Sequence, residues 1–119
     1  MKIRLLNGDF EDVIIKNYLI DRNGFSKSKF QTQIKEELIK EYPTDIICEE
    51  VYIKGEKFYL DFFLPALKIV IEVNGRQHSE HVKFFHRTKQ EFEKQQLTDR
   101  RKKEWCDING FKMVEIGYE

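Results

Sequence analysis

The sequence has few of the features that would place it in a specialised class of protein. Only two of its 119 residues are cysteines, Cys48 and Cys106, and they lie far apart with no Cys-x-x-Cys spacing. This spacing predicts neither a structural zinc site nor a disulfide framework, and favours two reduced core thiols. Lys plus Arg and Asp plus Glu number 21 each. Net charge therefore indicates no polyanionic partner, and a nucleic-acid surface would have to arise from uneven charge distribution.

Long hydrophobic runs are also missing. No apolar stretch approaches the roughly 20 residues that a membrane-spanning helix needs. The first residues, MKIRLLNGDFED, become acidic where a signal peptide would continue apolar. We therefore expect a cytoplasmic protein with no membrane partner.

What the chain does contain is typical of one folded domain. Hydrophobic residues make up 40% of the sequence and include ten Phe, which are large core-forming side chains. A chain of this length is long enough for one core and too short for two. We predict a single domain over residues 1–119, with residues 1–25 as an N-terminal extension and residues 28–116 as the core.

The central stretch is a predicted hairpin of residues 58–64 and 69–74, rich in β-branched and aromatic residues. If residues 65–68 form the loop, Asp61 falls directly opposite Glu72, on the face that Asn74 also occupies. Two adjacent carboxylates among apolar neighbours repel each other and are poorly solvated, so a divalent metal would compensate them. Alternatively, the pair lies on the solvent face of a half-exposed hairpin. The hairpin is apolar on both faces, however, as in covered central strands.

Other elements surround this hairpin. A capping box, Ser28-x-x-Gln31, opens a predicted helix over residues 28–42. A strand is expected at residues 46–53, a charged helix at 88–108 closed by Asn109-Gly110, and a strand at 111–116 parallel to a neighbour in the sheet. Short strands are expected near residues 3–5 and 13–15, separated by a turn at Asn7-Gly8. The predicted class is α/β, a mixed (α+β) sheet with the order αβββαβ.

With this element order, Asp61 and Glu72-Val73-Asn74 resemble the core of the PD-(D/E)XK nuclease superfamily, the restriction-endonuclease-like fold. More narrowly, the chain resembles the very-short-patch-repair-like (Vsr-like) branch of this superfamily. The segments that carry this resemblance are YLDFFLPALKIVIEVNGRQH, then Asp99-Arg-Arg-Lys102, Trp105, Asn109-Gly110 and VEI at 114–116. That branch includes small phage and homing-type nucleases. The resemblance covers residues 28–116. It implies a Mg²⁺- or Mn²⁺-dependent DNA endonuclease or nickase, acting in the host cytoplasm if a phage encodes it, with a homodimer or an accessory specificity protein as possible partners.

The resemblance also implies roles for single residues. Asp61 and Glu72 would be the metal ligands, or Glu72 would hold the attacking water. Asn74 stands where the superfamily has Lys and related short families have Asp, and an amide cannot act as a general base. His78 would relay a proton or orient water, unless it is simply a solvated loop residue. Gln31 would complete the metal shell, although the capping box explains it equally well.

Most of the remaining assignments lie on the long helix. Asp99 matches the acidic residue of the Vsr-like pattern, and its seven-residue spacing from Phe92 favours an inward position over a solvated one. Trp105 would stack on bases or belong to the core. The basic residues predicted to contact DNA phosphates are Arg76, Lys83, Arg100, Arg101, Lys102 and Lys103.

Two other functions fit the same residues. The departure at Asn74 makes a catalytically weakened nucleic-acid-binding module on the same fold credible. A structural subunit, in which Asp61 and Glu72 are only a solvated rim, is the other. The sequence contains no zinc finger or helix-turn-helix signature, so any sequence specificity would come from loops or from a partner.

Overall fold

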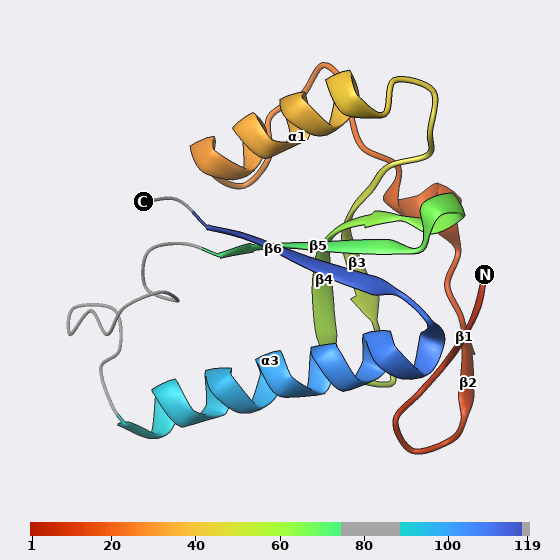
Figure 1. Cartoon of the computed structure of the whole chain (residues 1–119), viewed down its shortest axis with the longest axis vertical. Helices are drawn as coiled ribbons and strands as arrows, with labels where there is room; N and C mark the ends of the chain where they lie inside the picture. The colour runs from red at the N-terminus through yellow and green to blue at the C-terminus, as the bar shows by residue number, and fades with distance from the viewer. Residues whose placement is uncertain (75–88, 118–119) are drawn as a thin grey trace.

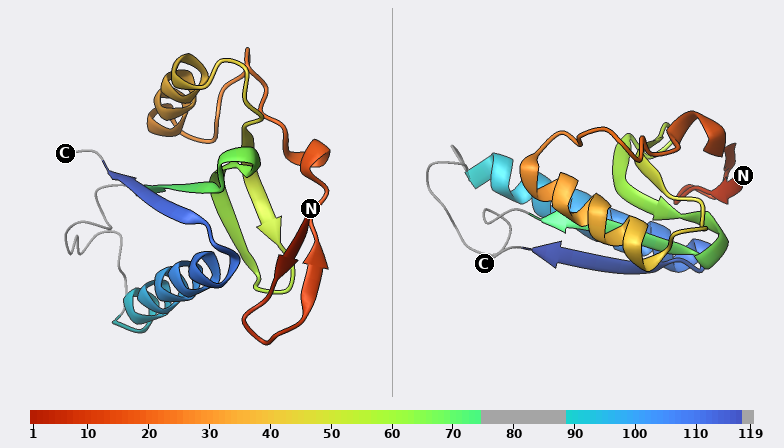
Figure 2. Two further views of the ribbon diagram at one scale, coloured as in Figure 1. Left: turned by 45° about the vertical axis from the view of Figure 1, so that its right-hand side comes forward. Right: turned by 90° about the horizontal axis from the view of Figure 1, so that it is seen from above.

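A computed structural model describes residues 1–74 and 89–117, without the side chains of Asn74 and residues 89–92. Four strands form a sheet in the order β3 (Cys48–Ile53), β4 (Phe58–Leu64), β5 (Ile69–Asn74) and β6 (Lys112–Gly117). Helix α1 (Lys29–Glu41) and helix α3 (Lys89–Asn109) lie on opposite sides of this sheet (Figures 1 and 2). The predicted mixed sheet and the element order αβββαβ are therefore present in the described residues.

The predicted strand pairing of the central hairpin is confirmed. β4 and β5 pair antiparallel from Leu64↔Ile69 to Phe62↔Ile71, with the short 3₁₀ turn Pro65–Leu67 between them. Lys68 closes that turn in a left-handed conformation, with φ of 56°. β5 and β6 pair parallel, as expected of strands joined through a crossover helix.

Local signals explain where both helices begin or end. The Ser28 side chain accepts a hydrogen bond from the Gln31 backbone N–H at 3.0 Å, which satisfies one of the free donors at the start of α1. Gly110 follows α3 with φ of +71°, a conformation that glycine adopts at little cost. The predicted boundaries of these helices are confirmed within one residue.

The N-terminal region corrects one prediction. The second short strand is β2 (Phe10–Asp12), paired with β1 (Lys2–Arg4), while Ile15–Tyr18 forms a 3₁₀ helix instead of a strand. The reason is the tight turn at Asn7-Gly8. The Leu5 N–H donates to Asp9 O at 2.8 Å, so the chain reverses early and pairing starts at Phe10.

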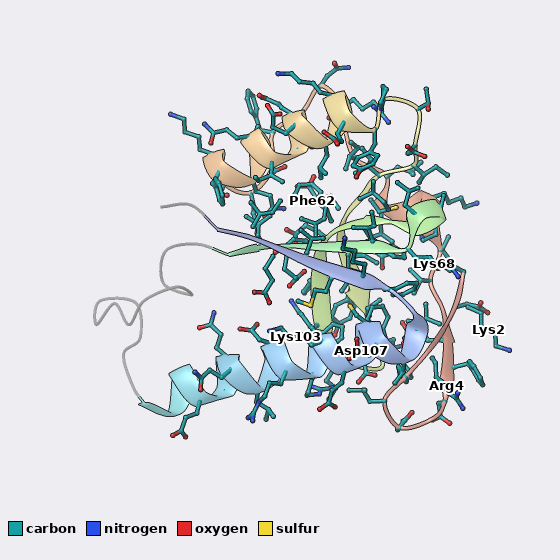
Figure 3. All side chains as sticks on the ribbon, viewed as in Figure 1. Lys2, Arg4, Phe62, Lys68, Lys103 and Asp107 are labelled. Carbon is teal, nitrogen blue, oxygen red and sulfur yellow. The ribbon has the colours of Figure 1, made fainter. Side chains whose placement is uncertain are left out.

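Separate apolar cores lie on the two faces of the sheet. Trp105 and Cys106 of α3 pack with Leu60, Phe63 and other residues on one face. On the other face, Leu38 of α1 packs with a second set that includes Phe62, Leu64 and Ile71. Figure 3 shows Phe62 between the sheet and α1.

Side chains along β3 and β4 do not alternate regularly between the two faces of the sheet, and the alternation breaks at one point in each strand. Leu60 and Phe63 both belong to the core on the α3 side although they are three residues apart, as do Cys48 and Val51. An ideal strand would place residues three apart on opposite faces. On β3 the shift coincides with Glu50, whose φ is +53°, an uncommon value for a non-glycine residue.

Candidate active site

Asp61 and Glu72 lock β4 and β5 together where their backbone pairing ends. The Asp61 N–H donates to Glu72 Oε2 at 3.0 Å, and the Val73 N–H donates to Asp61 Oδ2 at 2.7 Å. Beyond Phe62↔Ile71, each strand is thus held by a carboxylate of the other strand. We call this arrangement the carboxylate clasp. The two predicted carboxylates are brought together, at the register that the loop length implied.

The two carboxylates of the clasp reach different faces of the sheet. Glu72 is only 5% exposed, and its Oε1 lies 2.5 Å from Lys102 Nζ of α3. Asp61 Oδ1 instead faces Lys27 Nζ at 3.6 Å, from the segment before α1. The prediction that Asp61 and Glu72 share a face is therefore wrong. That prediction assumed that side chains alternate regularly between the two faces of the sheet, and in β4 this alternation breaks between Leu60 and Phe63.

Burial governs the electrostatics of Glu72. Desolvation raises the pKa of Glu72 above its usual value because the charged form is poorly solvated. The Lys102 ammonium opposes this rise, whereas the negative charge of Asp61 adds to it. Glu72 is therefore a carboxylate whose ionised form depends on a nearby cation.

Gln31 connects α1 to this site through carboxylates of β3. Its side chain is 1% exposed, and its Nε2 donates to Glu49 Oε2 at 2.8 Å and to Glu50 Oε1 at 3.0 Å. The capping interpretation therefore accounts for the Gln31 backbone but not for its side chain. Glu49 and Glu50 were not among the predicted site residues, although two consecutive acids inside a mainly apolar strand were an available signal.

Lys27 joins the β3 carboxylates to the clasp. Its Nζ lies 3.1 Å from Glu50 Oε1 as well as 3.6 Å from Asp61 Oδ1. Burial opposes the charge of Lys27, but the carboxylates of Glu50 and Asp61 outweigh it and raise the pKa of Lys27. Lys35, 2% exposed, lies 4.0 Å from Glu49 at the far end. A connected series of charged and polar side chains thus runs from Lys35 of α1 through Gln31 and Lys27 to the clasp and to Lys102.

The basic residues predicted to bind DNA divide into two kinds. Arg101 donates to Glu56 Oε1 at 2.9 Å, and Glu56 is 4% exposed. With Lys102 bound to Glu72, both of these cations are held by buried carboxylates. Arg100 is exposed. Lys103, 60% exposed, forms only a 3.6 Å surface ion pair with Glu115.

The other predicted residues are placed as follows. Asp99 is partly buried on α3, three residues before Lys102. Trp105 is 1% exposed and belongs to the core, so it is not available to stack on bases. Asn74 ends β5, and its side chain is not among those that the structure describes. Arg76, His78 and Lys83 lie outside the described residues.

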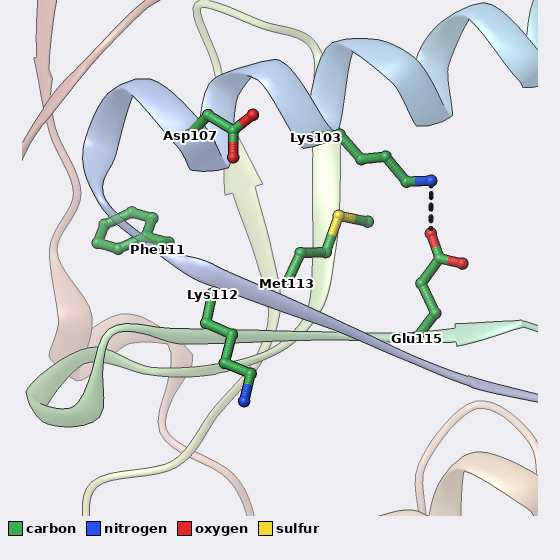
Figure 4. A pocket seen from close by; sticks show the side chains of 6 residues that line it. All are labelled: Lys103, Asp107, Phe111, Lys112, Met113 and Glu115. Carbon is green, nitrogen blue, oxygen red and sulfur yellow. Dashed lines mark ion pairs between the residues drawn. The ribbon is translucent and has the colours of Figure 1, made fainter.

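A pocket of about 570 Å³ lies between α3 and β6 (Figure 4), and one of its lining residues, Glu115, is the β6 strand partner of Glu72. Its lining residues are Lys103, Asp107, Phe111, Lys112, Met113 and Glu115. Neither Asp61 nor Glu72 lines it, and its walls carry both signs of charge. This pocket is therefore not the candidate active site.

The chemistry of the clasp suits a hard divalent cation. Mg²⁺ is usually bound through one or two carboxylates, with waters and substrate phosphates completing its shell. Asp61 and Glu72 supply two such groups, and the ammonium groups of Lys27 and Lys102 stand beside them as positive charges. Among the described residues, no group of three His, Cys, Asp or Glu side chains could hold a metal ion. A divalent cation held at the clasp would therefore have at most Asp61 and Glu72 as ligands from the described residues, with water or substrate completing its shell.

Comparisons with known proteins find viral relatives. The chain is 36% identical over 59 residues to "Uncharacterized protein 307L" of Invertebrate iridescent virus 6, which is 50% of the chain and 30% of that protein. It is 38% identical over 65 residues to "Uncharacterized protein 094L" of Frog virus 3, covering 54% of the chain and 42% of that protein. The matches thus span less than half of the length of each of these relatives. No family model and no solved structure matches the chain.

Within the part of the chain that is described, neither helix is long and apolar enough to cross a bilayer.

Proposed function

We propose that this chain is a metal-dependent phosphodiesterase that cleaves DNA, as an endonuclease or a nickase of the Vsr-like PD-(D/E)XK type. The observation that carries the proposal is the carboxylate clasp, in which Asp61 and a buried Glu72 meet where two central strands separate. The element order αβββαβ adds support. Perturbed, partly buried carboxylates next to a specific charge partner are typical of functional sites.

Within this proposal, Asp61 and Glu72 hold Mg²⁺ or Mn²⁺. The ion supplies charge neutralisation at the phosphate and a bound water of lowered pKa. Lys102 fixes Glu72 Oε1 at 2.5 Å and offsets the cost of its negative charge. Lys27 is 60% exposed at its side chain, so it is free to exchange its contact with Asp61 for one with a substrate phosphate.

The remaining assignments are kept as proposals. Asn74, His78, Gln31 and Asp99 stay in the candidate catalytic set. Of these, Gln31 acts through Glu50 and Lys27, because its amide binds Glu50 and Lys27 joins Glu50 to Asp61. Arg100 and Lys103, both exposed on α3, keep their predicted role as contacts to DNA phosphates. Arg76 and Lys83 keep the same predicted role, and a homodimer or an accessory specificity protein stays a proposed partner.

The test is plasmid cleavage by an Asp61→Asn variant. An Asn side chain still offers an oxygen to the Val73 N–H, so the clasp loses a charge but keeps its hydrogen bond. The assay measures nicking and linearisation of supercoiled DNA in Mg²⁺ or Mn²⁺, with EDTA as a blank. Metal assistance is worth several kcal/mol, so we expect the rate to fall by more than about 100-fold.

A matched variant controls for the loss of an acidic residue. Glu37→Gln removes a carboxylate that is 73% exposed on α1, and it should cleave like the wild type. If folded Asp61→Asn protein cleaves DNA at the wild-type rate, the clasp is not the active site.

A nucleic-acid-binding module without catalysis is the second candidate. It is favoured by the saturation of Glu72, whose two oxygens are already engaged by Lys102 and by the Asp61 N–H. Under this alternative, the wild type binds DNA but leaves plasmid intact in Mg²⁺ and Mn²⁺ at enzyme excess. A structural subunit would bind neither DNA nor Mg²⁺ in calorimetric titrations.

A further inference from the structure

The most exposed large hydrophobic side chain in the described residues is Phe25. It is 91% exposed, whereas Phe10, the next most exposed, is at 56%. Burying a Phe side chain is favourable by roughly 1.5–3 kcal/mol. Single exposed hydrophobic residues are normal on protein surfaces, but most remain partly covered by their neighbours. A phenylalanine that is almost fully exposed is available to contact a ligand.

The backbone on both sides of Phe25 is anchored. Before it, the Asn23 N–H donates to Asp21 Oδ1 at 3.0 Å, and the Gly24 N–H donates to Asp21 O at 3.2 Å. After it, the Ser26 N–H donates to Thr32 Oγ1 at 2.9 Å, which ties the segment to the first turns of α1. The ring is therefore held out from a fixed turn, and ordering it for binding costs less conformational entropy than ordering a free tail.

This turn leads directly to the carboxylate clasp. Lys27 follows Phe25 by two residues, a reach of about 7 Å, and contacts both Glu50 and Asp61. The start of α1 lies near the end of β5, whereas the β1–β2 hairpin lies on the opposite side of the molecule (Figure 1). Lys29, exposed at the first position of α1, adds a second cation near the ring.

We propose that Phe25 stacks on an unpaired base of a nucleic-acid strand whose phosphates contact Lys27 and Lys29. An aromatic ring beside cations is the combination that binds single strands, because every base offers a π-face and every nucleotide a phosphate. Bases inside a duplex are already stacked on both faces. The substrate class of the site is therefore DNA with an unpaired segment next to the scissile phosphate, such as a single strand, a flap or a mismatch. This inference rests on the proposed function for its substrate, while the binding itself does not require cleavage.

Binding is measured in EDTA, so that no cleavage occurs. The probes are a fluorescein-labelled 12-nucleotide oligothymidylate and a 12-base-pair duplex, each followed by fluorescence anisotropy. Stacking contributes about 1–3 kcal/mol per base, so Phe25→Ala should weaken single-strand binding by roughly 5- to 150-fold. Duplex binding should change less than about twofold, since phosphate contacts dominate it. Phe25→Trp should bind the single strand at least as tightly as the wild type.

The control variant is Phe10→Ala, which removes the other strongly exposed Phe from the distant hairpin. It should bind both probes like the wild type. A direct readout is photocrosslinking to an oligonucleotide that carries 5-iodouracil, with the crosslinked residue identified by mass spectrometry. The crosslink should map to Phe25.

Three results would overturn the inference: unchanged single-strand binding by Phe25→Ala, an equal loss for both probes, or no single-strand binding by the wild type. A ring that serves a protein partner would give the first of these.

The Asp61→Asn plasmid assay separates this inference from the proposed function. If Asp61→Asn still cleaves, the active-site assignment fails while a Phe25-dependent single-strand affinity stands.

Discussion

Replacing Lys102 by Met should leave the buried Glu72 carboxylate without its cation and so destabilise the folded protein. The side chains of Lys102 and Glu72 are 13% and 7% exposed, and their charged atoms are 2.5 Å apart. Met keeps most of the volume of Lys but cannot compensate the Glu72 carboxylate. Removing one partner of a buried ion pair typically costs about 3–5 kcal/mol, because the other charge stays buried without compensation.

The expected loss for Lys102→Met is about 3 kcal/mol in the free energy of unfolding. We choose the lower end because Lys102 keeps some exposure and Glu72 still accepts the Asp61 N–H. For a chain of this size, the loss corresponds to a fall of roughly 10 °C in Tm. It is a large share of the roughly 5–15 kcal/mol that stabilises a typical domain.

The raised pKa of Glu72 determines how the stability loss of Lys102→Met changes with pH. Burial raises the pKa of Glu72 in the folded protein above its value in the unfolded chain, and losing Lys102 raises it further. A carboxyl group with a raised folded pKa takes up protons more readily when folded. Its contribution to stability therefore falls as pH rises from the unfolded pKa, about 4.5, through the folded pKa. The deficit of Lys102→Met should thus be larger at pH 7.5 than at pH 5.

Urea unfolding at both pH values, followed by circular dichroism, measures this prediction. The double variant Lys102→Met with Glu72→Gln should recover most of the loss, since replacing both partners of a buried pair is often nearly neutral. Lys103→Met is the neighbouring control, because its pair with Glu115 is exposed and should be worth less than about 1 kcal/mol. A loss below about 0.5 kcal/mol for Lys102→Met at pH 7.5 would refute the reasoning.

Two further expectations concern other buried groups. Arg101→Ala should lower the unfolding free energy by about 2 kcal/mol in urea titrations, because the buried carboxylate of Glu56 loses its cation and keeps only the Leu6 N–H at 2.6 Å, while the 38% exposure of Arg101 keeps the loss below that of Lys102→Met. Arg100→Ala, at an exposed site, should change it by less than about 0.5 kcal/mol, and equal effects would contradict a clamp at Glu56. Burial raises the pKa of Cys48 to about 11 and that of Cys106 to about 12. Both thiols should therefore resist Ellman's reagent at pH 8 until the protein is unfolded, and rapid labelling of the native protein would show that they are accessible.

The register of the central hairpin was predictable because local chemistry decides it. Pro65 and the short loop after it leave few ways to join two β-prone strands, so Leu64 must face Ile69. That register brings Asp61 and Glu72 together. Ser28 and Gly110 are equally local signals, and they place the ends of the helices for the same reason.

The direction of the side chains at the site was not predictable in this way. The change of alternation in β3 and β4 depends on the left-handed conformation of Glu50 and on how three strands fit together. No local pattern in the sequence specifies it. The run Arg100-Arg-Lys-Lys103 is similar: its composition indicates phosphate binding, yet Arg101 and Lys102 face buried carboxylates that lie 45 and 30 residues away in the chain.

The sequence alone therefore determined the element order, the strand register and the meeting of Asp61 with Glu72, since these depend on neighbours in the chain and on loop length. The tertiary structure decided which cation serves which carboxylate: Lys27 for Asp61, Lys102 for Glu72 and Arg101 for Glu56. It also decided that Gln31 binds Glu50 and that Phe25 stays exposed. The physical reason is that a buried charge must find a partner of opposite sign within a few ångströms. Only the packing of both helices against the sheet determines which side chains come that close.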